Sequence, residues 1–450
     1  QNVGTVTSIT AGTGLSGGAI TSAGTIAIDS TVATLTGTQT LTNKTLTSPV
    51  ATGTVDINGN LDVDGGTIKL DGNYPTGTNN VALGDQALSS GSLSGASNTA
   101  VGSLSLLSNT SGADNTAMGL CSLRLNTTGG QNTAIGRKAM ANNTEGANNT
   151  AIGRQAMVAN TTADNNTAVG AQALENSTTG DNNTAVGLQA LTANTTGYTN
   201  TAVGNLALCS NTTGLSNSAF GYCGLGKNTT GRCNTAVGRN SLAANTTACN
   251  NTAIGYDSLK ANTTGSSLTA VGHLALSANT TATLNTAVGQ CALKTNTTGS
   301  HNSAFGVPAL LCNTTGACNS AFGRLALCAN TTADSNTAVG YAALQANTTG
   351  GANTAVGAYA LDSNTTGYAN VAIGCDALQT NTEGFQNVAV GENSLELNTT
   401  GDKNVAIGVT ALRANTTAGN NTAVGFSSLK CNTTGGNNVA IGYSSLCTNI

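Results

Sequence analysis

Proline, tryptophan, aromatic rings and charge are all scarce in this chain of 450 residues. It contains 3 Pro and no Trp, with 3% aromatic and 8% charged residues, while Gly occurs 58 times. This composition excludes the series of ordinary globular domains that the length alone would suggest. It does not indicate disorder either, because the 38% of hydrophobic residues recur at fixed intervals.

Clusters of basic residues and long apolar runs are missing as well. The net charge is −4, and Lys and Arg are scattered along the chain. We therefore expect neither nucleic acid nor an anionic membrane as a partner. No apolar run approaches the roughly 18 residues of a membrane-spanning helix, so no such helix is expected.

Residues for catalysis and metal binding are equally sparse. The 2 His, His273 and His301, occupy non-equivalent positions, which indicates neither a catalytic triad nor a histidine metal site. Asp and Asn alternate from Asp56 to Asp64 with the spacing of calcium ligands, but without the central Gly and terminal Glu of an EF-hand. A strand with a solvated polar face explains this segment equally well. We expect no enzyme activity and no cofactor.

What the chain does have is a repeat. A glycine that closes an Asn-Thr-Ala-Val-Gly-like motif recurs every 17 residues from Gly102 to Gly442, and Gly84 adds one copy at a spacing of 18. Such self-similarity predicts a solenoid, in which each unit buries its apolar face by stacking on its neighbours. We predict an all-β chain, with a parallel β-solenoid (β-roll) of about 22 coils over residues 79–450 and a small β-rich region over 1–78.

Positions are counted below from this repeat glycine, so that Val169 is at −1 and Ala171 at +1 in the coil of Gly170. Position −1 is always large and apolar, and position +4 is always Leu or Met. We interpret these two positions as the core. Representative core residues are Val169, Leu174, Val186, Leu191, Val203 and Leu208.

Position −2 is Ala in every copy, and no side chain larger than a methyl group appears there or at the repeat glycine. A solvated face would accept larger residues, so we expect this face to pack closely against another chain. Its representatives are Ala168, Gly170, Ala185, Gly187, Ala202 and Gly204. The simplest arrangement is a homotrimer with the Ala/Gly faces near its axis.

The alternation in Thr-Ala-Val-Gly predicts a short strand, and the Ala-Leu pair at +3 and +4 predicts a second one. Asn-Thr-Thr-Gly, as at 194–197, predicts a turn with left-handed Asn and Gly. Phe replaces Val at −1 in three coils, always together with Ser for Thr at −3, as in Ser303 and Phe305. This exchange of volume indicates that the two positions share a face, which we interpret as the inward one.

Cysteine and asparagine carry two further hypotheses. Three Cys pairs are 16 residues apart, which predicts disulfides between adjacent coils, with coincidence as the alternative. The pairs are Cys233 with Cys249, Cys312 with Cys328, and Cys431 with Cys447. Asn-Thr-Thr is also a glycosylation sequon, and the alternative is a turn with a hydrogen-bonded Asn ladder. Representative sequons begin at Asn126, Asn194, Asn245 and Asn398.

Two resemblances complete these observations. Asn166 to Gly170, followed by Ala173 and Leu174, resembles the repeated head motif of trimeric autotransporter adhesins, which implies a left-handed β-roll and a trimer. The motif covers residues 79–450, although its unit is shorter in those heads. Residues 4–28 and 34–50 resemble segments of phage tail fibres and other virion structural proteins.

From these features we expect a structural fibre protein, a trimeric rod of the phage tail fibre type at a virion surface or outside the cell. It would serve attachment to a host, with a glycan or another receptor as its partner. The array stops within a coil at Ile450, leaving a sheet edge open to pairing, so a self-polymerising extracellular filament is the alternative. Ice binding by regular Thr columns is a weaker one, because Ser218 and Val371 interrupt the column.

Overall fold

The protein is described by a computed structural model that covers residues 15–16, 27–28 and 77–447. The chain divides into two compact units, residues 1–69 and 70–450, and the boundary expected from the sequence at 78/79 lies close to this division. In the first unit the described residues form one antiparallel pair, with Leu15 opposite Ile28. The Asp56–Asp64 segment lies outside the described residues.

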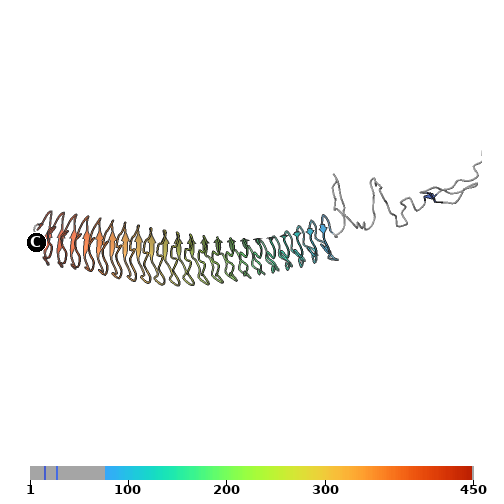
Figure 1. Ribbon diagram of the computed structural model, residues 1–450, viewed down its shortest axis with the longest axis horizontal. Coiled ribbons are helices and arrows are strands. Elements are labelled where there is room, and N and C mark those ends of the chain that lie inside the picture. Colours follow the sequence, from blue (N-terminus) through green and yellow to red (C-terminus); the bar gives the residue numbers. More distant parts are fainter. Residues whose placement is uncertain (1–14, 17–26, 29–76, 448–450) are drawn as a thin grey trace, which may run out of the picture. The chain divides into compact units, whose positions relative to one another are not determined.

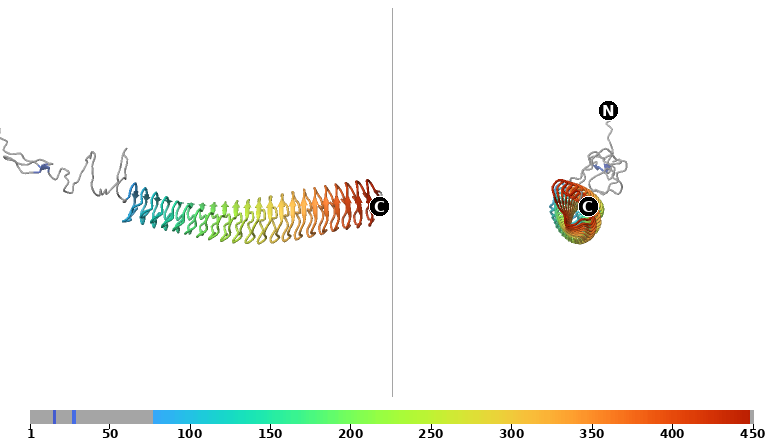
Figure 2. Two further views of the ribbon diagram at one scale, coloured as in Figure 1. Left: turned by 180° about the vertical axis from the view of Figure 1, so that it is seen from behind. Right: turned by 90° about the vertical axis from the view of Figure 1, so that its left-hand side faces the viewer.

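The second unit is a parallel β-solenoid, as the repeat predicts. Each coil contributes one strand of three residues to a single parallel sheet that follows the rod, and the described residues contain no helix. Figure 1 shows the stacked coils as a gently curved rod, and the end-on view in Figure 2 shows its narrow cross-section.

The strands are β1 (Leu15–Ser16), β2 (Ala27–Ile28), β3 (Val81–Leu83), β4 (Thr99–Val101), β5 (Thr116–Met118), β6 (Thr133–Ile135), β7 (Thr150–Ile152), β8 (Thr167–Val169), β9 (Thr184–Val186), β10 (Thr201–Val203), β11 (Ser218–Phe220), β12 (Thr235–Val237), β13 (Thr252–Ile254), β14 (Thr269–Val271), β15 (Thr286–Val288), β16 (Ser303–Phe305), β17 (Ser320–Phe322), β18 (Thr337–Val339), β19 (Thr354–Val356), β20 (Val371–Ile373), β21 (Val388–Val390), β22 (Val405–Ile407), β23 (Thr422–Val424) and β24 (Val439–Ile441).

Every strand pairs in register with the equivalent strand of the next coil, so identical positions stack into columns. Thr167 faces Thr184 and Ala168 faces Ala185 in the pairing of β8 with β9. The backbone bonds continue around the coil, for example from the Leu174 N–H to the Ala190 carbonyl (2.9 Å). Neighbouring coils are therefore held together on all sides, although only three residues of each form a strand.

The predicted assignment of the strand faces is wrong. The Ala at −2 is fully buried, as Ala168, Ala185 and Ala202 show. Val169, Val186 and Val203 point outward and are only partly buried, while the repeat glycines beside them are also partly exposed. Alternation requires one set of residues to face inward, and the narrow interior accepts a methyl group rather than a branched side chain.

The interior combines Ala with Leu or Met at +4, and that part of the predicted core is confirmed. Leu174, Leu191 and Leu208 have no exposed surface. However, these residues lie in a turn and not in a second strand, since the Leu at +4 has a left-handed backbone, with φ of 50° at Leu174. Left-handed residues also occur at +2 and +12, and not at the Asn and Gly of the Asn-Thr-Thr-Gly turn.

Candidate functional site

The outer face of the parallel sheet is the most extended surface feature of the solenoid. Positions −3 and −1 point outward from every strand, and in the described coils they carry no Asp, Glu, Lys or Arg. Position −3 is Thr, Ser or Val, whereas position −1 is always apolar. Because the coils are in register, this face is an uncharged band along the rod.

We call the stacked residues at position −1 the apolar column. It consists of Leu83, Val101, Met118, Ile135, Ile152, Val169, Val186, Val203, Phe220, Val237, Ile254, Val271, Val288, Phe305, Phe322, Val339, Val356, Ile373, Val390, Ile407, Val424 and Ile441.

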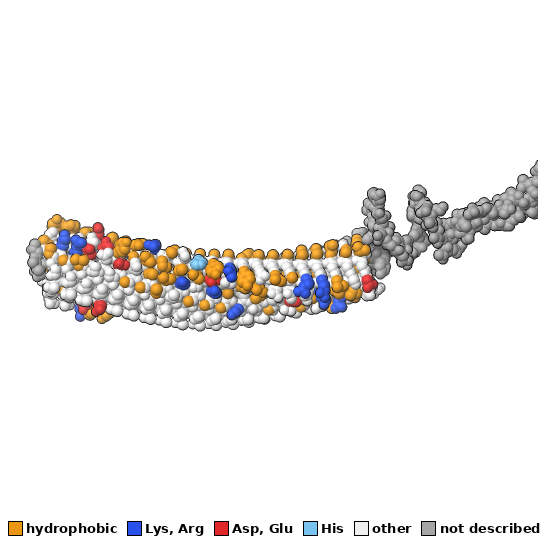
Figure 3. Space-filling view, in the orientation of Figure 1, with side chains coloured by type: hydrophobic (Ala, Val, Ile, Leu, Met, Phe, Trp, Pro, Cys, Tyr) orange, Lys and Arg blue, Asp and Glu red, His pale blue; other side chains and the backbone are white. Residues whose placement is uncertain are grey.

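Large side chains in the apolar column are exposed to an unusual degree. Phe220, Phe305 and Phe322 expose 42%, 37% and 41% of their surface, so the three Phe residues face solvent and not the core as predicted. The rings of Phe305 and Phe322 stack with their centroids 4.9 Å apart. The Ser at −3 beside each Phe does share its face, so the volume exchange occurs on the outer surface. Figure 3 shows hydrophobic side chains following the rod along its length.

The predicted glycosylation sites are buried structural residues. Asn126, Asn194, Asn245 and Asn398 have no exposed surface. The Asn126 Nδ2 donates to the Asn109 Oδ1 (2.8 Å) and to the Gly129 carbonyl (2.9 Å), and equivalent bonds recur in the other coils. A glycan cannot be attached to an amide nitrogen enclosed in this way. The alternative interpretation, a hydrogen-bonded Asn ladder, is confirmed.

A second Asn ladder runs through position −4. The backbone N–H of Asn132 donates to the Asn115 Oδ1 (3.0 Å), and the Asn132 Nδ2 donates to the Gly146 carbonyl (2.8 Å). The two ladders satisfy backbone groups that turn into the narrow interior. The core is thus polar at two positions of every regular coil, which explains why the sequence needs so much Asn.

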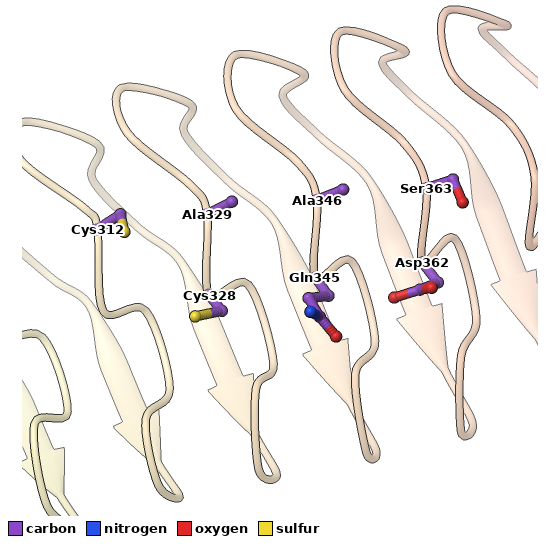
Figure 4. Close-up of a pocket in the computed structure, with 7 residues that line it drawn as sticks. All are labelled: Cys312, Cys328, Ala329, Gln345, Ala346, Asp362 and Ser363. Atoms are coloured by element: carbon purple, nitrogen blue, oxygen red, sulfur yellow. The ribbon is translucent and has the colours of Figure 1, made fainter.

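The predicted disulfides are not formed, and all twelve cysteines are free thiols. Each residue stacks on the one 17 positions away, so thiols 16 apart lie in different columns: Figure 4 shows Cys312 in line with Ala329, and Cys328 in line with Gln345. Both line a surface pocket of about 320 Å³. Burial, and then the nearby Cys312, raise the pKa of the Cys328 thiol, which keeps it protonated at neutral pH.

The other two pairs also lie on adjacent coils. The Cys431 N–H donates to the Cys447 carbonyl (3.3 Å). Cys249 lies against Arg232, whose backbone N–H donates to its Sγ (3.4 Å), and not against Cys233. The stacking rule is therefore the same in all three pairs.

The histidines lie apart from each other, and neither approaches a possible metal site. His273 stacks on the Tyr256 ring with centroids 5.4 Å apart, and His301 is exposed at position +12. Within residues 77–447 and the two short strands before them, no group of three or more His, Cys, Asp or Glu residues could hold a metal ion. No helix long and apolar enough to cross a membrane occurs in the same residues.

Charged and polar side chains gather on the flank of the rod, at positions +2 and +5, which contact each other. Lys260 pairs with Asp257 (2.9 Å), and Gln379 donates to Asp376 (2.9 Å). Burial would raise the pKa of the Asp257 carboxyl, but hydrogen bonds from Lys260 and Asn240 hold it below its ordinary value. Burial and the charge of Asp376 raise the pKa of the Asp362 carboxyl at the same flank.

Basic residues cluster on this flank in a way that the linear sequence concealed. Arg124, Arg137, Lys138 and Arg154 belong to three successive coils, and Figure 3 shows a group of Lys and Arg side chains near the N-terminal end of the rod. The expectation that no basic cluster exists was therefore wrong. Writing the sequence in rows of 17 would have revealed it.

A search of protein families and of curated proteins finds no match to this chain.

Proposed function

We propose that this chain is a non-enzymatic structural rod whose copies associate side by side, most simply as a homotrimer, to form an attachment fibre at a virion surface or outside the cell. The observation that carries the proposal is the apolar column, which is uncharged and exposed through 22 coils. Apolar patches on monomeric proteins are usually limited to about 300–600 Å². A column that extends on the order of 100 Å is a candidate interface.

The shape of the apolar column favours another copy of this chain as its partner. Only a surface with the same spacing between coils can follow the column along its whole length, and a second solenoid has that spacing. Packing of the columns would bury Val, Ile and Phe that are now partly exposed. The trimer axis then lies at the apolar column, and not at the Ala/Gly face expected from the sequence.

The attachment role is supported by the resemblance of residues 4–28 and 34–50 to phage tail fibres, and by that of the repeat to trimeric adhesin heads. A rod of stacked coils separates its two ends by a fixed distance. Such a spacer suits a protein that presents a binding surface away from its point of attachment.

Native mass and negative-stain images test the lateral association. We expect particles of three chains for the natural protein. Lys at positions 152, 169 and 186, in Ile152→Lys, Val169→Lys and Val186→Lys together, places three charges in the apolar column and should give single chains. The matched control is Gln155→Lys, Gln172→Lys and Gln189→Lys, which adds the same charge to the flank of the same coils and should leave the trimer intact.

Single chains of the natural protein would overturn the proposal. Long polymers that grow with concentration would instead favour the end-to-end filament. Equal masses for the two triple variants would show that the apolar column is not the interface.

A further inference from the structure

We propose that Arg124, Arg137, Lys138 and Arg154 form a binding site for a short acidic oligosaccharide, one that carries carboxylate or sulfate groups. These four residues are called the basic patch. They come from the coils of Gly119, Gly136 and Gly153, which stack in register, as the bond from the Gln155 N–H to the Arg137 carbonyl shows (3.0 Å). The inference deepens the attachment role and rests on it for its biological meaning.

The positions of the basic patch are ones whose side chains contact each other. Arg124 is at +5 and Lys138 at +2 of the next coil, and both line one surface pocket. Elsewhere these two positions hold complementary partners, such as Lys260 with Asp257 or Gln172 with Glu175 (3.0 Å). In the basic patch the same positions hold cations without an acidic partner.

Neutralisation is missing from the patch although it occurs elsewhere on the rod. Among the described residues, the four cations make no ion pair and no contact with an aromatic ring. By contrast, Arg413 pairs with Glu396, and Arg239 lies over the Tyr222 ring (5.6 Å). Arg137 and Arg154 are stacked at position +1 of adjacent coils, where like charges repel. An anion between these side chains would remove the repulsion.

The pocket between Arg124 and Lys138 has the mixed chemistry of a sugar site. Its volume is about 230 Å³, and it is lined by Cys121, Arg124, Lys138, Ala141, Asn142 and Val158. Ala141 and Val158 offer an apolar wall for the C–H face of a sugar ring, and Asn142 offers an amide to hydroxyl groups. Arg124 can bind a carboxylate or sulfate through two parallel N–H donors.

The limited size of the patch favours an oligosaccharide over a nucleic acid. Three coils at a spacing of about 4.8 Å give the patch a length for only a few charged groups. Glu175 follows in the next coil, and the net charge of the whole chain is −4. A long polyanion would therefore meet repulsion beyond the patch, whereas a short acidic sugar would not.

Binding of defined oligosaccharides to the full chain tests the site. The probes are a sulfated heparin-derived hexasaccharide, a galacturonic acid hexamer, neutral maltohexaose and a short single-stranded DNA, titrated at low and high salt. We expect at least one acidic sugar to bind in a salt-sensitive way and maltohexaose not to bind. Arg124→Gln with Lys138→Gln, and separately Arg137→Gln with Arg154→Gln, should each weaken binding by about tenfold or more.

The matched control is Lys294→Gln with Lys430→Gln, which removes two cations at position +5 outside the patch and should bind like the natural protein. The site is refuted if neither acidic sugar binds, or if the control loses as much affinity as the patch variants. DNA binding as tight as that of the sugars would also overturn the assignment. Native mass, measured on the same samples, reports lateral association separately, so failure of the binding site and failure of the fibre proposal can be told apart.

Discussion

Glycine at the repeat position is required by the backbone and by its neighbour together. Gly272 has a φ of 135°, a conformation that residues with a Cβ rarely adopt. A Cβ atom there would lie 2.5 Å from the Gly289 carbonyl oxygen of the next coil. Both effects recur from coil to coil, which explains why this glycine is found in every copy.

Gly272→Ala should therefore open its coil locally. Coils in a solenoid interact mainly with their neighbours, so we expect faster amide hydrogen exchange around residues 255–290 with little change at distant coils. The loss should be at least about 1–3 kcal/mol, the usual strain of an unfavourable backbone conformation. Gly91→Ala is the control, since a Cβ there meets nothing within 4 Å and should change exchange little. Equal protection in both variants would contradict this account of the repeat glycine.

One coil departs from the first Asn ladder, and the departure leaves a defect. Ser177 stands where other coils have Asn, and its hydroxyl and the Asn160 Oδ1 are both buried without a hydrogen-bond partner. Leaving such groups unpaired costs about 1–3 kcal/mol each.

Ser177→Asn should repair the ladder, because its Nδ2 can donate to the Asn160 Oδ1. We expect local stabilisation by about 1 kcal/mol, seen as slower hydrogen exchange between residues 160 and 194. Ser210→Asn, on the surface at position +6, is the control and should have little effect. Unchanged or faster exchange in Ser177→Asn would show that the added volume outweighs the restored bond.

At the scale of the strand and the turn, the sequence predicted the period but not the direction of the side chains. Alternation over Thr167, Ala168 and Val169 indicates that two faces differ, and it is silent on which face is inside. The usual rule that the larger apolar residue is buried failed because two buried Asn ladders and Leu174 already fill the interior. The second predicted strand failed because a left-handed Leu can occur only where its side chain fills the core of a turn.

The flank formed by positions +2 and +5 contains two carboxylates that should respond to pH in opposite ways. The pKa of Asp257 is lowered in the folded chain, so its stabilising effect is complete above the unfolded value of about 3.9 and is lost as the pH falls through the folded value. The pKa of Asp362 is raised, so its ionisation opposes folding at neutral pH and this cost disappears on acidification.

At pH 7, Asp257→Asn should speed local hydrogen exchange and Asp362→Asn should slow it. The effect of Asp257→Asn should stay below about 1 kcal/mol, since its partner Lys260 is largely exposed. Each variant serves as the control for the other, because both remove one charge from the same flank. Titration of the two carboxyl groups by NMR gives the direction of each pKa directly, and two shifts of the same sign would contradict the assignment.

At the scale of the whole rod, the repeat length determines the architecture. The parallel solenoid and the number of its coils were predicted because the spacing of 17 is nearly uninterrupted. The basic patch and the position of the candidate interface were not, since both depend on stacking of residues from different coils and on which strand face is outside.

Deleting residues 341–357 removes one complete coil and joins Gly340 to Ala358 in the natural register. We expect a folded rod of unchanged thermal stability, shorter by about 4.8 Å. Deleting residues 341–356 removes one residue fewer and should shift every later column, which turns buried residues outward at the junction. Thermal unfolding followed by circular dichroism should separate the two, and similar curves would contradict a fixed period of 17.

The Asn ladders also bear on how such a chain ages. Asparagine is among the residues that degrade readily at high temperature, and deamidation begins when the next backbone nitrogen attacks the side-chain amide. In this rod the Asn194 amide is enclosed, and the N–H of Thr195 that would have to move is bonded to the Thr212 carbonyl (2.9 Å). A sequence that looks chemically short-lived is thus protected by its own fold, and its amides should deaminate only after the coils have opened.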